Sequence, residues 1–93
     1  MPDPAKLELV RARLAKTFPT AHLRVRDPGR FQPIAFMLRW SPLREARVRV
    51  AWERFESYGS AEEILPAAAL HALEAGASVL VLPDGFEIES GER

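Results

Sequence analysis

Three consecutive segments of this chain alternate apolar and polar residues with a period of two, which is the pattern of strands with one buried face. They cover residues 22–26, 34–41 and 46–55, and turn-forming residues separate them at 27–30 and at Pro42. A sheet with one apolar face needs a cover on that side, because exposing it to water is costly. The pattern therefore predicts a mainly antiparallel sheet beneath a layer of helices.

The first covering element is a helix that we expect between Asp3 and Phe18. Asp3 followed by Pro4 is typical of a helix start, because the carboxylate caps the first turn and proline needs no donor there. Apolar residues then recur at helical spacing. Pro19 disfavours helical backbone at the residue before it, so the helix should end at Phe18.

A second helix is expected from Ser60 to about Ala75. Ser60 and Glu63 have the spacing of a capping box, and Gly76 suits the position after a helix end. Pro66 lies inside this segment and leaves two interpretations open. Either the helix is kinked at Pro66, or a short turn precedes a new helix that begins there.

Two short strands are expected after this helix. Residues 78–82 form an apolar run with the length of a buried strand, and residues 86–89 alternate after a turn at 83–85. Residues 90–93 are expected to form a frayed tail. A chain of 93 residues has room for one hydrophobic core, so we expect residues 1–93 to form a single domain.

These elements predict an α+β fold arranged as a two-layer sandwich. The expected order is α-β-β-β-α-β(-β), with a mainly antiparallel sheet and both helices on one of its faces. The residues expected to point toward the helices include Leu23, Ile34, Phe36, Val48 and Trp52.

The composition excludes several kinds of chemistry. The absence of cysteine excludes disulfides, thiolate metal ligands and cysteine nucleophiles. Asparagine is absent too, and arginine outnumbers lysine eleven to two, a thermophile-like bias that a GC-rich genome would also produce. No apolar run approaches membrane-spanning length, and the first residues lack a signal-peptide pattern. We therefore expect a soluble, cytoplasmic protein that does not bind membranes.

Charge is divided unevenly along the chain. Residues 1–50 carry a net charge of +7 and residues 51–93 a net charge of −7, so the formal net charge of zero conceals a strong asymmetry. Such an asymmetry is a hint about partners, although it names none.

The predicted sheet gives the positive charge a location. If helices cover the apolar side, the opposite side of the three strands carries His22 and five arginines. The pattern places only Asp27 and Glu53 nearby as acids, so these cations need solvent, an anionic partner or acids from elsewhere in the chain. The candidate anion-binding or partner-binding residues are Arg24, Arg26, Arg39, Arg47 and Arg49.

This basic face has three interpretations. It is a solvated surface of an arginine-rich protein, a contact surface for a protein that includes a second copy of the chain, or an anion-binding sheet for nucleic acid. Basic and acidic regions on one surface favour two-fold dimers, and open sheet edges in a small domain also favour self-association.

Known nucleic-acid modules can be compared residue by residue. The expected order is similar to that of a double-stranded RNA-binding domain, which has cations at the start of its second helix, where this chain has Ala61, Glu62 and Glu63. An RNA-recognition motif presents aromatic residues on its open sheet face, where this chain offers Met37 and arginines. A KH domain needs a GxxG loop, which this chain lacks. Only nonspecific electrostatic binding to nucleic acid remains as a hypothesis.

The stretch Leu14–Asp27 resembles the start of BolA-like proteins, which have a helix, a break of the Phe-Pro type and a strand that ends in Asp. It covers about a sixth of the chain. The conserved histidine and the Arg-His-Arg helix motif of that family have no counterpart here, and residues 46–55 are an extra element. The resemblance therefore implies no function for this chain.

No catalytic constellation is visible. A hydrolase triad needs a nucleophile, a base and an orienting acid in contact, and no nucleophile-elbow motif surrounds Ser57, Ser60 or Ser78. His71 and Glu74 lie one turn apart on the expected second helix, but two ligands do not make a metal site. We expect no cofactor, no metal and no small-molecule substrate.

The sequence therefore favours a non-enzymatic module for protein interaction, including self-association as a homodimer. The alternative is an accessory nucleic-acid-binding protein that uses the basic sheet face.

Overall fold

The computed structural model describes residues 3–27, 29 and 32–90, which form an α+β fold. The described residues contain four helices and a five-stranded mixed sheet. In chain order the elements are α1 (Pro4–Thr17), β1 (His22–Arg26), β2 (Ile34–Ser41), β3 (Arg44–Val50), α2 (Trp52–Ser57), α3 (Ala61–Ile64), α4 (Ala67–Glu74), β4 (Ser78–Leu82) and β5 (Gly85–Ser90).

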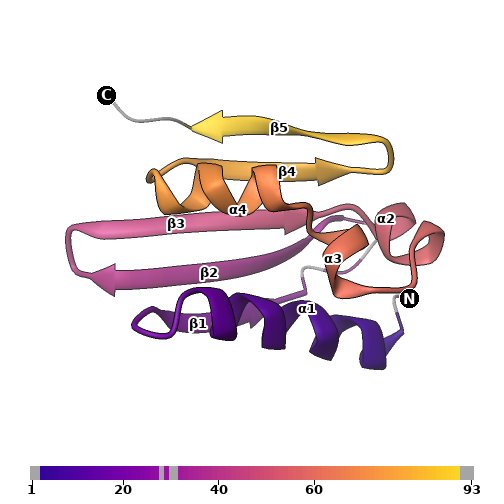
Figure 1. The fold of residues 1–93 in the computed structure, drawn as a ribbon, viewed down its shortest axis with the longest axis horizontal. Helices are drawn as coiled ribbons and strands as arrows, with labels where there is room; N and C mark the ends of the chain where they lie inside the picture. Colours follow the sequence, from indigo (N-terminus) through magenta and orange to yellow (C-terminus); the bar gives the residue numbers. More distant parts are fainter. Residues whose placement is uncertain (1–2, 28, 30–31, 91–93) are drawn as a thin grey trace.

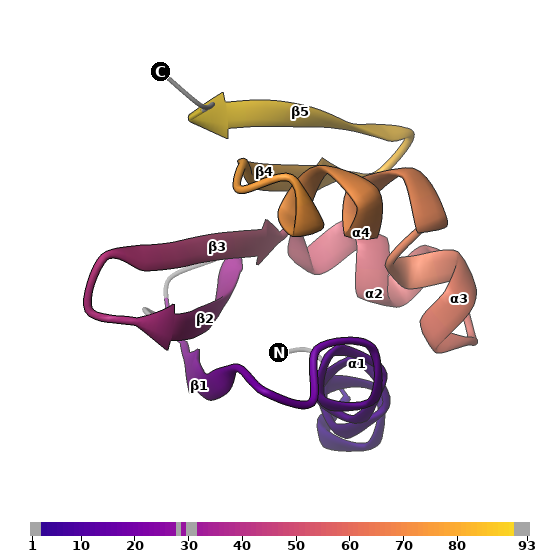
Figure 2. The same ribbon diagram turned by 60° about the vertical axis from the view of Figure 1, so that its left-hand side comes forward.

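The strands lie in the sheet in the order of the chain, β1-β2-β3-β4-β5. The pairs β1–β2, β2–β3 and β4–β5 are antiparallel, and β3–β4 is parallel. A parallel pair needs a crossover, which α2, α3 and α4 provide. Strands β1 and β5 form the two opposite edges of the sheet, and the helices lie over one of its faces (Figures 1 and 2). The expectation of helices on one face is confirmed.

The hydrophobic core lies between the helices and the sheet. Most helix-side residues of the inner strands β2, β3 and β4 are almost fully buried, as the alternation predicts, whereas Val25 and Ile88 on the edge strands are partly exposed. Helices α1 and α4 and the segment around Ile64 complete the core from the other side. Its largest fully buried side chains are Phe36, Phe55, Leu14, Ile34, Leu38, Ile64, Leu65, Leu73, Val10, Val48, Val50 and Val79.

Helix α1 begins and ends where the sequence predicts. The Asp3 carboxylate accepts a hydrogen bond from the Ala5 N–H at 2.9 Å, which satisfies one of the free donors of the first turn. At the other end the Phe18 N–H donates to the Leu14 carbonyl at 2.8 Å, and the helix stops before Pro19.

The third strand is shorter than predicted. Alternation continues in the sequence to Phe55, but β3 ends at Val50 and residues 52–57 form helix α2. The expectation that Trp52 and Glu53 lie on a strand is therefore wrong. Helix α2 has no side-chain cap, and its two buried side chains, Arg54 and Phe55, hold it against the rest of the fold.

Arg54 is 6% exposed and donates hydrogen bonds only to carbonyl oxygens. Its partners come from the last turn of α3, at Glu63 (2.6 Å) and Ile64 (3.1 Å), and from the β4–β5 turn. The turn carbonyls belong to Leu82 (3.2 Å) and Pro83 (3.1 Å). The guanidinium also lies over the Tyr58 ring, 4.3 Å from its centroid. One side chain thus joins α2, α3 and the β4–β5 turn.

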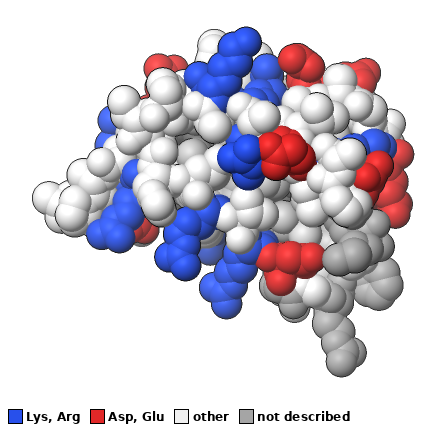
Figure 3. Space-filling model, turned by 90° about the horizontal axis from the view of Figure 1, so that it is seen from below, with Lys and Arg blue, Asp and Glu red and all other residues white. Residues whose placement is uncertain are grey.

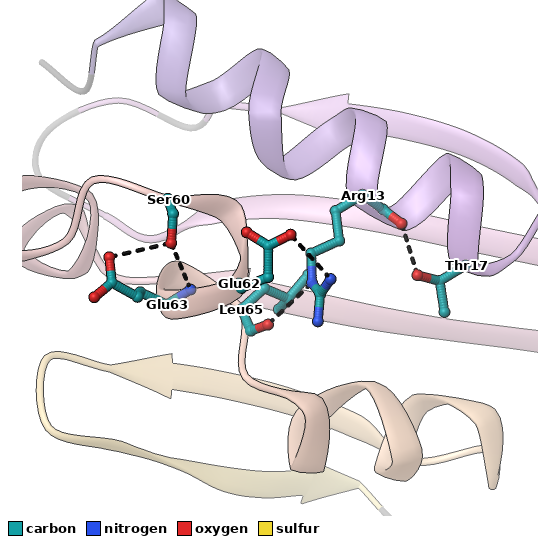
Figure 4. Close-up of polar contacts among 6 residues, drawn as sticks. All are labelled: Arg13, Thr17, Ser60, Glu62, Glu63 and Leu65. Atoms are coloured by element: carbon teal, nitrogen blue, oxygen red, sulfur yellow. Dashed lines mark hydrogen bonds and ion pairs between the residues drawn. The ribbon is translucent and has the colours of Figure 1, made fainter.

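Pro66 starts a new helix and does not kink a longer one, which decides between the two interpretations. Helix α3 ends at Ile64, and Pro66 is the residue that precedes α4. Ser60 is the N-cap as predicted, because its Oγ accepts from the Glu63 N–H at 3.2 Å (Figure 4). Glu63 Oε1 accepts from the Ser60 hydroxyl at 3.1 Å, whereas in a full capping box it would accept from the Ser60 backbone N–H. Gly76 follows α4 with φ of 99°, the left-handed conformation expected after a helix end.

Arg13 on α1 contacts helix α3 and the residue that follows it. Its Nε donates to the Leu65 carbonyl at 3.3 Å, and its Nη1 lies 3.7 Å from Glu62 Oε2 (Figure 4). Glu62 is one of the residues that would stand at the phosphate-binding position of a double-stranded RNA-binding domain. Here its carboxylate forms an ion pair with Arg13 of α1.

The chain ends in the predicted hairpin of β4 and β5. Strand β5 extends to Ser90, one residue into the expected tail, and residues 91–93 lie outside the described residues. In the turn after β1, the Gly29 N–H donates to Asp27 Oδ1 at 2.9 Å, and φ of Gly29 is 79°. Pro28 and Arg30 of this turn also lie outside the described residues.

Candidate protein-binding face

The sheet gathers the five predicted arginines on the face that is turned away from the helices, which we call the outer face. In the β1–β2–β3 register, Arg24 lies beside Met37 and Met37 beside Arg47. In the neighbouring row Ala35 stands between two further arginines, and Arg39 follows opposite His22. We call this set the arginine face: Arg24, Arg26, Arg39, Arg47 and Arg49.

The arginines on β1 and β3 are separated by one small or apolar residue on β2. Strands lie about 4.8 Å apart, so the backbones of Arg24 and Arg47 are about 10 Å apart, too far for direct contact of like charges at their bases. Ala35 is 8% exposed between its two arginine neighbours. The result is an apolar floor with basic side chains on both sides. A hollow of about 560 Å³ on the β1–β2 part is lined by His22, Arg24, Val25, Arg26, Met37, Leu38, Arg39 and Glu45.

Two of the five arginines have acidic partners. Arg39 Nε lies 3.4 Å from Glu45 Oε2 on the adjacent strand, where both side chains are about half exposed and the pair is weak. Arg49 Nε donates to Glu89 Oε1 at 3.0 Å, and its Nη2 contacts the second carboxylate oxygen. Neither acid is one that the alternation places nearby, so acids from elsewhere in the chain, an alternative that the sequence leaves open, reach this face.

The two acids that pair with these arginines could not be placed from the alternation as predicted, for different reasons. Glu45 lies two residues before Arg47 and therefore on the same face of a strand. Starting the third strand two residues earlier, at residue 44, places Glu45 on the outer face. Glu89 reaches the face from β5, and only the order of strands in the sheet reveals that.

Electrostatics at this pair lower the pKa of Glu89. The hydrogen bond from Arg49 is the main cause, partial burial opposes it, and the positive charges of Arg49 and Arg47 add to the lowering. The same hydrogen bond raises the pKa of Arg49 above its ordinary value. Glu89 is thus a carboxylate held in its charged form by the arginine face.

The other three arginines, Arg24, Arg26 and Arg47, are exposed and form no ion pair with any residue that the structure describes. In the space-filling view, separate basic side chains project along the lower left border of the molecule (Figure 3). Three guanidiniums without an ion pair among the described residues give this surface a positive potential, which attracts anions.

Acidic side chains gather elsewhere. Helices α2 and α3 and the β4–β5 turn lie at the end of the molecule opposite the β2–β3 hairpin (Figure 1). Most acidic side chains in the view of Figure 3 lie in its right half. The exposed acids of this end are Glu53, Glu56, Glu62, Glu63 and Asp84. The division of charge along the sequence therefore becomes a division in space.

The residues considered for catalysis do not converge. His71 and Glu74 are exposed on α4, and the part of the chain that the structure describes contains no group of three potential metal ligands. Ser78 is buried, and its hydroxyl accepts the N–H of Arg47 at 3.0 Å. These side chains have structural or solvent-exposed positions.

Comparisons with family models, with curated proteins and with solved structures find no match to this chain. Within the described ranges, no helix has the length and apolar character needed to cross a membrane.

Proposed function

We propose that this protein is a non-enzymatic interaction module whose arginine face binds acidic surfaces of proteins, including a second copy of itself. The single observation that carries the proposal is a trio of exposed arginines around Met37 that form no ion pair within the described part of the chain, namely Arg24, Arg26 and Arg47. Guanidiniums bind carboxylates with two parallel hydrogen bonds, and an adjacent apolar surface adds burial to the charge contact. A cytoplasmic location is part of the same proposal.

The composition of the face favours protein over nucleic acid as the partner. Glu45 and Glu89 lie among the arginines and would repel a phosphate backbone, whereas a protein surface with mixed charges can accommodate them. Among the described residues, the outer face of β1, β2 and β3 holds no Phe, Tyr or Trp on which a base could stack, and His22 is its one aromatic side chain.

The test is retention of the protein on immobilised polyglutamate as salt is raised from about 50 mM to about 500 mM, a range over which surface attraction is screened. The formal net charge is zero, so retention requires a local basic surface. The double substitution Arg24→Ser and Arg47→Ser should abolish retention. The matched control, Arg11→Ser and Lys16→Ser, removes the same charge from α1 and should leave retention intact. Equal loss in both variants, or no retention of the unmodified protein, would refute the proposal.

One observation favours the alternative of a nucleic-acid-binding protein. The hollow over β1 and β2 is lined by three arginines and His22, and it could hold part of a phosphate backbone. Binding to duplex DNA would then weaken with salt at a logarithmic slope of about −0.9 per neutralised phosphate. Replacing Arg24 and Arg26, which both line the hollow, by Ser should make the slope less negative by about 1.8, the value for two lost phosphate contacts. An unchanged slope would exclude this hollow as the binding site.

A further inference from the structure

The two edge strands of the sheet carry opposite charges on the outer face. Strand β1 presents Arg24 and Arg26, and strand β5 at the far edge presents Glu87 and Glu89. Among the described residues no strand pairs with the free side of either edge. Unpaired edges are templates for another strand, and their side chains decide which strand fits.

The same two strands expose apolar side chains on the opposite face. Val25 is 43% exposed on β1 and Ile88 is 52% exposed on β5. Both point to the helix side, because they pair with the inward-facing Phe36 and Val79. Each edge therefore has an uncovered apolar residue between charged ones.

We propose that β1 of one copy pairs with β5 of a second copy, which extends the sheet from molecule to molecule. This inference rests on the proposed function and names its partner as the chain itself. With Val25 opposite Ile88, an antiparallel register places Arg26 opposite the exposed Glu87, while Glu89 stays bound to Arg49 of its own copy. Directly opposite residues lie about 4.5–5.5 Å apart at Cβ, which is close enough for both the apolar contact and the Arg26–Glu87 ion pair.

The strand directions permit this pairing. Strand β1 runs parallel to β3, and strand β5 runs antiparallel to β3. If a second copy is moved sideways within the plane of the sheet, its β5 therefore lies antiparallel to β1 of the first copy. Backbone polarity agrees as well. The Ala51 N–H donates to the Val81 carbonyl at 2.9 Å. Successive residues of a strand direct their N–H and C=O groups to opposite neighbours, so this one bond fixes the direction for every residue of the sheet. Followed to the two edges, it directs the N–H and C=O groups of Val25 and Ile88 toward the free sides.

Charge excludes the competing arrangements. Pairing β1 with β1 of another copy would oppose arginines to arginines, and pairing β5 with β5 would gather glutamates. Only the unlike edges attract. They lie at opposite sides of the molecule, so each added copy leaves a new free edge and the assembly does not close at two copies (Figure 1). The expected product is an open series of oligomers, unlike the two-fold dimer expected from the sequence.

The experiment measures weight-average mass by light scattering at low salt over a wide range of protein concentration. The weight-average mass of the unmodified protein should rise smoothly above 10.4 kDa as its concentration increases, without a plateau at twice that mass. Arg26→Glu and Glu87→Arg should each require a protein concentration roughly three to ten times higher for the same mass, because each opposes like charges. The double substitution, and an equimolar mixture of the two single variants, should restore association. Lys16→Glu on α1 is the matched control and should associate normally.

The outcomes separate this inference from the proposed function. A plateau at twice the monomer mass, or no rescue by the double substitution, would overturn the edge pairing. A constant mass of 10.4 kDa with retention on polyglutamate intact would also overturn it, while the arginine face would stand as a binding surface for other proteins. Loss of both association and retention would mean that the proposed function itself has failed.

Discussion

Arg49 on β3 binds Glu89 on β5 across the intervening strand β4, with 3.0 Å between Nε and Oε1. This contact neutralises one arginine of the arginine face and ties an edge strand to the middle of the sheet. It also explains where the free charge lies. Among the described residues, the arginines of this face that form no ion pair are Arg24 and Arg26 on β1 and Arg47 on β3.

Replacing Glu89 by Gln should change the pH dependence of stability. The pKa of Glu89 is lowered in the folded protein, so its contribution to stability is present above the unfolded-state pKa of about 4.3 and is lost as pH falls through the lower folded value. The unmodified protein should lose about 1 kcal/mol more than Glu89→Gln between about pH 7 and about pH 2. Urea unfolding at the two pH values measures this, and equal losses would contradict the role of the pair.

Replacing Arg54 by Met should destabilise the fold by about 2–4 kcal/mol, because buried carbonyls of α3 and the β4–β5 turn lose their donor. Arg54→Lys should recover only part of this, since an ammonium cannot reproduce the planar set of donors. Arg11→Met on the exposed surface of α1 is the control and should cost less than about 0.5 kcal/mol. Urea midpoints give the comparison, and similar midpoints for Arg54→Met and the control would contradict this role.

Gly76→Ala should destabilise the protein by about 1 kcal/mol, because φ of 99° is strained for any residue with a Cβ atom. Gly59→Ala is a useful control, since a Cβ there meets no heavy atom within 4 Å and no positive φ is involved. Thermal unfolding of both variants checks the difference. An equal effect at the two positions would argue against the assigned backbone at Gly76.

The substitutions Arg24→Ser and Arg47→Ser should leave stability unchanged within about 0.5 kcal/mol, and at low salt they should raise it slightly, because both charges are exposed and unpaired. Loss of binding without loss of stability is the signature of a functional surface. Urea unfolding at low and high salt is the measurement. A clear loss of stability would indicate that these arginines have a structural role instead.

Local patterns in the sequence predict the strands and helix ends well, because their causes are local. The caps at Asp3 and Ser60 and the stop at Phe18 depend on neighbouring residues alone. The alternation around Val48 predicts the face on which Arg47 and Arg49 lie, because neighbouring residues of a strand point to opposite faces and no distant contact is needed to decide it.

Features that depend on distant contacts could not be predicted in this way. Alternation continues through Trp52, but Arg54 finds its carbonyl partners in α3 and in the β4–β5 turn, and helix α2 forms in place of further strand. The ion pair between Arg49 and Glu89 needs the position of β5 in the sheet. The candidate face was thus predictable from parity, whereas the pairing of its charges required the fold.

The most direct measurement of the central claim is a map of amide chemical shifts in the ¹⁵N-labelled protein as a polyglutamate peptide is added. We expect the shifted resonances to cluster at Arg24, Met37 and Arg47 on the outer face, and to return to their positions in the free protein as salt is raised. Shifts confined to α1 around Arg11 and Lys16, or no shifts at all at low salt, would contradict it.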